Sequence, residues 1–344
     1  MRKHFRKLVK ITLVLIYLVI IAGATVRMTG SGMGCPDWPK CFGYYIPPTA
    51  EHQLLWQPDK AYKKGQVIIV DEALYVAKRD FKTALQYNMS NWAAYTKHDY
   101  AVFNAYHTWV EFINRLIGAL AGLATLLMAF VSFRFWKEKK IVTILSWVAV
   151  FGMGFQGWLG ATVVYSVLAP VKVTLHMVMA LAIVALILHI VHLTGEKEVR
   201  FKSSTVFKRF LLLAFSFTVI QIVLGTQVRQ FVDEQVKVLG DHAAGMWLRD
   251  APVQFYIHRS FSIAVLALNG FLFLYGRKRR LGYFRMNYVM VLLMIEILTG
   301  IAMNYADFPF GSQAIHLILA SIVFGIQYYL ILEVKKALQF QRRL

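Results

Sequence analysis

The chain is poor in charged residues and in cysteine. Only 16% of its 344 residues are charged, whereas 58% are hydrophobic, and the mean hydropathy is +0.52. A soluble domain of this length would have far more apolar surface than its core can bury, so the surplus must face lipid. The chain has only two cysteines, which makes a thiolate metal site an unfavourable interpretation.

Long apolar segments take the place of a soluble core. Eight of them have about the length that crosses a hydrocarbon layer of ~30 Å. They cover residues 11–27, 105–133, 141–165, 171–193, 210–228, 254–275, 287–305 and 312–334. Helices are implied, because open strands would leave backbone polar groups unsatisfied in lipid. The sequence therefore predicts an all-α integral membrane protein with eight transmembrane helices.

Acidic residues are scarce, at 18 against 38 Lys and Arg, which gives a net charge of +20. Of the basic residues, 23 lie at alternating span ends, within residues 2–10, 134–140, 197–209, 277–285 and 335–343. By the positive-inside rule these ends are cytoplasmic. Both termini are then inside and the long 28–104 connection is outside. Membrane orientation explains the charge better than a nucleic-acid partner does.

An internal repeat organises the chain. The sequence GATVR at 23–27 returns as GTQVR at 225–229, and INR at 113–115 returns as IHR at 257–259. Gly160 and His176 match Gly300 and His316 in the same order. An even number of spans in each half predicts two parallel four-helix bundle repeats, residues 1–200 and 201–344. The repeat also favours the first span as a helix of the mature protein over a cleaved signal peptide.

Three of the ten histidines lie just inside the outward ends of even-numbered spans: His176, His258 and His316. Ionisable side chains in a membrane are costly, so they are functional candidates, although a neighbouring helix can also satisfy such a histidine. His258 and His316 have similar depth in one half, which suits a six-coordinate heme for electron transfer. Zinc would need further ligands that this half does not supply.

Two arginines, Arg229 and Arg259, lie near the level of this histidine pair. They are placed either to meet the propionates of a heme or to extend to the membrane interface.

The first half differs from the second at this level. Glu111 and Asn114 stand where the second half has phenylalanine and histidine, while His176 is retained. One half would thus hold a heme through two histidines and the other through one. Glu111 and Arg115 share a helix face, with Asn114 close to it. They form either a charge-neutralising ion pair or, as we favour, a reaction site, because a carboxylate beside an open iron position suits oxygen chemistry.

The sequence resembles the heme A synthase family over essentially its whole length. The matching segments are GATVRMTGSG at 23–32, CPDWPKC at 35–41, EFINR at 111–115, QGWLG at 156–160 and IHR at 257–259, together with His176 and His316. The resemblance implies oxidation of the C8 methyl group of heme O to the formyl group of heme A. Two oxygenations of one carbon give a geminal diol, which loses water. Electrons would pass through heme b from a donor that the sequence does not identify.

The resemblance also implies residue roles. The second half of this family holds heme b, here through His258 and His316. The first half binds heme O, here at His176, with Glu111 as the acidic residue that the reaction needs.

One position departs from the family. Span two usually reads Glu-x-x-His-Arg, and this chain has Asn114 in place of the histidine. The second axial ligand of the substrate heme is therefore open. His107, two turns nearer the outside, is one candidate, and Asn114 acting on bound water or oxygen is another. An inactive heme-binding relative is a third interpretation.

The long connection carries both cysteines. Cys35 and Cys41 can close a small ring as a disulfide outside the membrane, or they remain two free thiols. The family carries a cysteine pair here, which the resemblance implies to be redox-sensitive and to stabilise the loop over the substrate site. Residues 60–82 alternate enough to predict a small hairpin or cap.

Two other classes of function compete with this interpretation. A diheme membrane subunit for quinol oxidation would predict two bis-histidine sites, which Asn114 disfavours. A transporter would need a polar path between the two sides, and the inner halves of the spans have almost no ionisable residues. The preferred interpretation implies a protein of the cell membrane, with its heme sites toward the outer face. It is compatible with a partnership with heme O synthase and with a homo-oligomer.

Overall fold

The computed structural model describes residues 2–97, 102–195, 201–202 and 204–341. Within these residues, eight helices are long and apolar enough to cross a membrane, which confirms the predicted fold class. They are α1 Arg2–Met28, α2 Ala105–Ser132, α3 Lys140–Tyr165, α4 Pro170–Leu193, α5 Thr205–Leu239, α6 Val253–Lys278, α7 Arg285–Tyr305 and α8 Ser312–Gln341. Short 3-10 helices are η1 Ser31–Met33, η2 Glu51–Gln53, η3 Met89–Asn91, η4 Phe133–Phe135 and η5 Asp241–Met246.

Local chemistry explains several helix ends. The side chain of Asn104 accepts a hydrogen bond from the backbone N–H of His107 and caps α2, and Ser204 caps α5 in the same way. Pro170 occupies the first turn of α4, where its missing N–H costs nothing. Helix α5 continues past the predicted residue 228 to Leu239. This outer extension holds the ion pair between Arg229 and Asp233, which are one turn apart.

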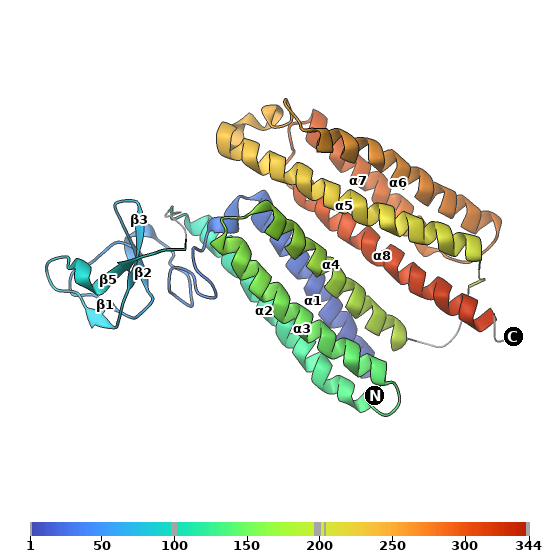
Figure 1. Ribbon diagram of the computed structural model, residues 1–344, viewed down its shortest axis with the longest axis horizontal. Coiled ribbons are helices and arrows are strands. Elements are labelled where there is room, and N and C mark those ends of the chain that lie inside the picture. The colour runs from blue at the N-terminus through green and yellow to red at the C-terminus, as the bar shows by residue number, and fades with distance from the viewer. Residues whose placement is uncertain (1, 98–101, 196–200, 203, 342–344) are drawn as a thin grey trace.

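The helices pack as two rings of four. In the first ring α1 and α3 each contact α2 and α4, and in the second α5 and α7 each contact α6 and α8. Helix α8 also packs on α1 and α4, and so joins the rings, which lie side by side in Figure 1. The start of α1 and the end of α8 lie at the end of the molecule away from the strands (Figure 1). This arrangement agrees with the predicted pair of four-helix repeats.

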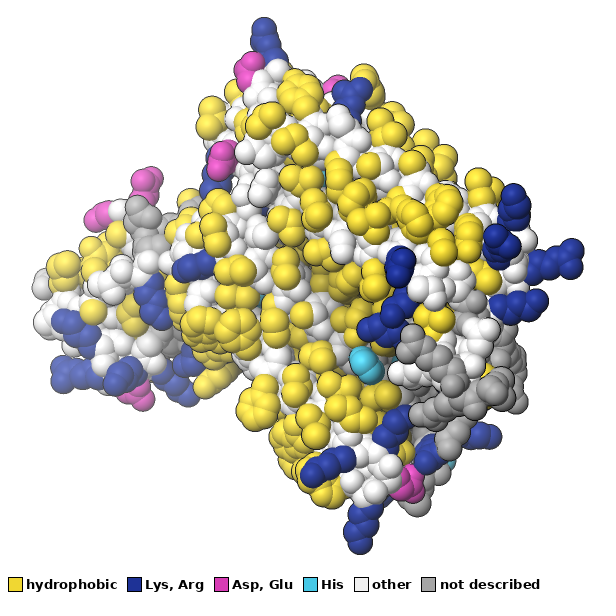
Figure 2. Space-filling model, turned by 45° about the vertical axis from the view of Figure 1, so that its right-hand side comes forward, with side chains coloured by type: hydrophobic (Ala, Val, Ile, Leu, Met, Phe, Trp, Pro, Cys, Tyr) yellow, Lys and Arg dark blue, Asp and Glu magenta, His cyan; other side chains and the backbone are white. Residues whose placement is uncertain are grey.

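The outer surface of the helices is apolar. Phe151, Ile263 and Leu274 are 75%, 69% and 65% exposed. Figure 2 shows hydrophobic side chains over much of one face of the helical part, with Lys and Arg mostly toward its ends. A surface of this kind is stable only against lipid tails, so the protein is a multi-pass membrane protein.

The connection between α1 and α2 folds into a small strand region. The three-stranded sheet has the order β2-β3-β5 and the two-stranded sheet pairs β1 with β4. The strands are β1 Ala61–Tyr62, β2 Val67–Val70, β3 Ala73–Ala77, β4 Phe81–Lys82 and β5 Trp92–Ala94. The β2–β3 hairpin confirms the prediction for residues 60–82. Strand β5 was not predicted; its Trp92 packs edge-on against the buried ring of Tyr62.

Candidate heme sites

Four equivalent positions, one on each even-numbered helix, lie against a glycine of the odd-numbered helix before it. In the first half, a Cβ atom added to Gly23 would lie 3.9 Å from Asn114 Oδ1, and one added to Gly160 would lie 3.3 Å from His176 Cε1. In the second half, a Cβ atom added to Gly225 would lie 3.0 Å from His258 Cε1, and one added to Gly300 would lie 3.7 Å from His316 Cε1. An added Cβ would crowd the imidazole at Gly160 and Gly225, whereas at Gly23 and Gly300 it would make an ordinary van der Waals contact. This equivalence agrees with the internal repeat and places three histidines and one asparagine in corresponding environments.

The two histidines of the second half face one another. The ring centres of His258 and His316 are 6.3 Å apart, with an angle of 66° between the ring planes. Two collinear bonds of about 2 Å from imidazole nitrogens to one metal place the ring centres roughly 6 Å apart. Among the described residues there is no group of three or more His, Cys, Asp or Glu side chains that could hold a metal. The two facing imidazoles therefore suit the iron of a heme, which can take two such ligands.

Hydrogen bonds orient His316. Its Nδ1 lies 3.0 Å from the carbonyl oxygen of Glu296 and 2.9 Å from Thr299 Oγ1. A carbonyl only accepts, so we assign the proton to Nδ1, which leaves the Nε2 lone pair free for a metal. The Glu296 carboxylate lies 3.9 Å from Nε2, too far for a hydrogen bond.

Glutamines anchor the backbone of two of these histidines. Gln156 Nε2 donates to the carbonyl oxygen of His176 at 2.9 Å, and Gln221 Nε2 donates to that of His258 at 3.0 Å. The buried Nδ1 atoms of both histidines have no hydrogen-bond partner within the described part of the chain, and the same holds for the buried Asn114 Oδ1. Buried polar atoms without partners are unusual and mark a place where a ligand or water can bind.

Glu111 and Arg115 form a buried ion pair in the first half, with side-chain exposures of 5% and 13%. The second carboxylate oxygen of Glu111 accepts the backbone N–H of Cys35 at 2.9 Å. Arg115 Nη1 donates to the carbonyl oxygens of Asp37 and Lys40 at 2.7 and 2.8 Å. The sequence predicted that the two side chains share a face, but it gave no sign that both bind the backbone of the outer loop. The reaction role of Glu111 stays a prediction.

The outer loop is tied to the helices at several further points. The Sγ atoms of Cys35 and Cys41 are 2.04 Å apart, a disulfide separation, and both residues are buried. Thr108 Oγ1 donates to the carbonyl oxygen of Gly34 at 2.7 Å, where the loop backbone touches the first turn of α2. Burial raises the pKa of Asp37, although the Gly43 N–H at 2.8 Å and the Arg115 charge act against this rise.

His107 lies farther out on α2. It precedes Asn114 by seven residues, so the two side chains are separated by about 10 Å along the helix axis. Its ring is 5.8 Å from that of Tyr106. The structure does not bring His107 to the level of Asn114, and its assignment to the substrate heme stays a prediction.

The two arginines expected near propionates have different surroundings. Arg229 forms an ion pair with Asp233 at 2.8 Å and donates to the carbonyl oxygen of Arg27 at 2.9 Å. Arg259 is exposed, and it donates to the Tyr305 hydroxyl at 3.2 Å. Sequence reasoning did not include Arg27 or Asp233 in the site. The repeat of GATVR as GTQVR, with an aspartate one turn after the second arginine, was the available signal.

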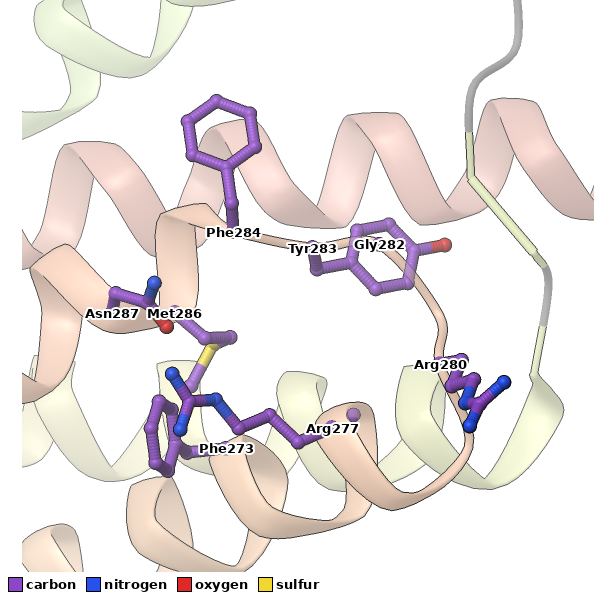
Figure 3. A pocket seen from close by; sticks show the side chains of 9 residues that line it. Phe273, Arg277, Arg280, Gly282, Tyr283, Phe284, Met286 and Asn287 are labelled. Carbon is purple, nitrogen blue, oxygen red and sulfur yellow. The ribbon is translucent and has the colours of Figure 1, made fainter.

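A recess at the opposite end of the second half is a separate feature. Phe273, Arg277 and Tyr283 are among the side chains that line it, where α6 ends and α7 begins (Figure 3). The Arg277 guanidinium lies 4.6 Å from the centre of the Phe273 ring. By helix rise, Arg277 is about 28 Å from His258 along α6, so this recess is not part of a heme site.

Fold and site together define a multi-pass membrane protein with a paired-histidine site suited to heme. The family COX15-CtaA, described as cytochrome oxidase assembly protein, matches residues 6–69 and 64–328. The chain belongs to this family.

Curated relatives carry the name heme A synthase. The protein from Ehrlichia canis is 24% identical over 93% of this chain and 90% of its own length. The protein from Shouchella clausii is 24% identical over 98% of this chain and 99% of its own length. A third, from Shewanella oneidensis, is 27% identical, and that match spans 63% of this chain and only 54% of the relative. The resemblance seen in the sequence is thus confirmed.

Proposed function

We propose that this protein is a heme A synthase, an enzyme that acts on heme O. Its family and the names of its full-length relatives support this activity. The observation that carries the proposal is the set of four equivalent positions, three histidines and one asparagine, at one level of the two bundles. The reaction is oxidation of the C8 methyl group of heme O to a formyl group.

The second half, residues 201–344, holds the cofactor, heme b. His258 and His316 would hold its iron, and Glu296 and Thr299 fix the orientation of the His316 ring. When bound, heme b supplies one-electron transfer. The arginine Arg229 lies one helical turn outward of this level.

The first half, residues 1–200, binds the substrate. His176 would hold its iron, and Asn114 has a shorter side chain than the histidine at the equivalent position of the second half. The Glu111 carboxylate holds or moves a proton near the reacting methyl group, and Arg115 and the Cys35 N–H fix its position. The loop from 34 to 43 lies on the outer turns of α2 and limits the access of water there.

The protein is proposed to lie in the cell membrane with both termini in the cytoplasm and the heme sites toward the outer face. The start of α1 and the end of α8 lie at the same end of the helices (Figure 1). The positive-inside rule assigns the span ends that carry the five basic clusters of the sequence to the cytoplasm. The strand region and the four axial positions lie toward the other end.

The test is extraction and mass analysis of hemes from protein expressed together with a source of heme O. We expect heme A with the unchanged protein, none with Glu111→Ala, and normal amounts with Glu234→Ala, which removes an exposed carboxylate of α5. Heme b alone in all three preparations would favour the rival function, a diheme subunit for quinol oxidation, or an inactive relative.

A further inference from the structure

Two arginines that are equivalent in the repeat meet between the halves. Arg27 follows Gly23 by four residues in α1, and Arg229 follows Gly225 by four residues in α5. Each arginine is therefore one helical turn outward of the glycine that lies against an axial position. The two halves thus direct the same kind of side chain toward a common interface, just outside their heme sites.

One carboxylate links both arginines. Asp233 Oδ2 accepts from Nε and Nη2 of Arg27 at 3.0 and 2.8 Å, and Asp233 Oδ1 pairs with Arg229 Nη2 at 2.8 Å. Arg229 Nη2 also donates to the backbone carbonyl oxygen of Arg27 at 2.9 Å. The contact therefore joins α1 of the first half to α5 of the second.

The charges of this cluster do not balance. Two guanidinium groups face one carboxylate, so the three side chains carry one net positive charge. The arginine side chains are only 22% and 18% exposed, for Arg27 and Arg229 respectively. The buried Nη1 atom of Arg229 has no hydrogen-bond partner among the residues that the structure describes. A half-satisfied, partly buried guanidinium is costly unless a further anion binds to it.

We propose that Arg27 and Arg229 form a carboxylate-binding site shared by the two halves, in which Asp233 is the resident counter-ion and the ligand is a propionate of heme b. This inference rests on the proposed function, because the ligand belongs to a heme held by His258 and His316. Arginine presents its N–H groups in a planar fork that matches a carboxylate. The first half thereby contributes a residue to the cofactor site of the second.

The test compares two probes, iron protoporphyrin IX with free propionates and its dimethyl ester, which lacks those charges. Each is titrated into full-length apo-protein in detergent, and binding is followed by the low-spin absorption spectrum. Loss of one charged hydrogen-bonding partner predicts a weaker affinity of Arg27→Gln for the free acid, by roughly tenfold, with little change for the ester. Arg249→Gln, an exposed arginine of the outer α5–α6 connection, is the matched control and should bind both probes as the unchanged protein does.

A second variant should change the preference for the free acid over the ester in the opposite direction. Asp233→Asn removes the charge that competes with a propionate, so the preference for the free acid over the ester should rise several-fold. A cluster that only joins the halves would change both probes equally in Arg27→Gln and would give no rise in Asp233→Asn, and either result overturns the inference. Failure of the proposed function is a different outcome: heme b binds with the expected preference, but heme O is not converted.

Discussion

The two halves of the molecule use the same scaffold for different sites. Both are rings of four helices, and in both a glycine of each odd-numbered helix lies against the equivalent side chain of the next helix. At the equivalent positions the first half has Glu111 and Asn114, and the second has Phe255 and His258. The helix framework is thus retained while two side chains on one helix face alter the chemistry. The second half thereby has two facing histidines, His258 and His316, whereas the first has a buried carboxylate, Glu111, paired with Arg115.

The outer connections differ in the same direction. The first half connects α1 to α2 through residues 29–104, which include the cysteine pair and five strands. The second half connects α5 to α6 through the short η5 segment. Since Glu111 and Arg115 both bind the loop backbone, the longer connection is coupled to the residues that distinguish the first half.

The strongest test of the comparison is removal of the histidine pair. His258→Ala and His316→Ala should each abolish the low-spin spectrum of the cofactor, because the second strong-field imidazole that keeps the iron low-spin is lost. His176→Ala should leave that spectrum intact and remove only substrate binding. Absorption and electron paramagnetic resonance spectra of the purified proteins check this, with His189→Ala as the control at the opposite end of α4. A low-spin spectrum that survives in both variants of the pair would contradict the assignment.

A second substitution makes the two halves alike at one of the equivalent positions. Asn114→His would place an imidazole at the position that His258 occupies in the second half. With heme O bound, a second low-spin signal should appear, and heme A formation should be retained, because the heme A synthase family usually has a histidine at this position. Resonance spectra and heme extraction measure the two effects, and Asn114→Ala should give no such signal. If Asn114→His instead abolished heme A formation, the space left by the asparagine would be needed for the reaction in this chain.

Much of this comparison could be predicted from sequence, and the rest could not for identifiable reasons. Apolar length identified the eight spans, and matched Gly and His positions identified the repeat, because both are local or periodic signals. Asp233 was missed because its partner Arg27 is 206 residues away in the chain. The contacts of Arg115 with the loop were missed because every residue has a backbone carbonyl, so the sequence does not show which carbonyls accept hydrogen bonds. Strand β5 is too short for its alternation to be distinguished from a turn.

A smaller effect should follow from separating the buried ion pair of the first half. Glu111→Gln leaves Arg115 without its charged partner, which should lower the free energy of unfolding by about 3 kcal/mol. This value is at the lower end of the range for breaking a buried ion pair, because the amide oxygen of the glutamine can still accept the Cys35 N–H. Denaturant unfolding in detergent measures it. In a double-mutant cycle, Arg115→Gln combined with Glu111→Gln should cost less than the sum of the single changes. Strict additivity would show that the two side chains act independently.

The smallest expected effect concerns Asp37, which lies in the long outer loop that distinguishes the first half from the second. Burial raises its pKa above the ordinary value of 3.8, so the folded protein favours the protonated form. Its contribution to stability is therefore fully present below the unfolded-state pKa and is lost as the pH rises through the folded-state pKa. Asp37→Asn, whose amide oxygen can still accept the Gly43 N–H, should match the unchanged protein in acid and exceed it slightly in Tm at neutral pH. Glu72→Gln, an exposed carboxylate of the strand region, is the control. A Tm difference that is constant with pH would mean that hydrogen bonding, rather than titration of the carboxyl group, governs this position.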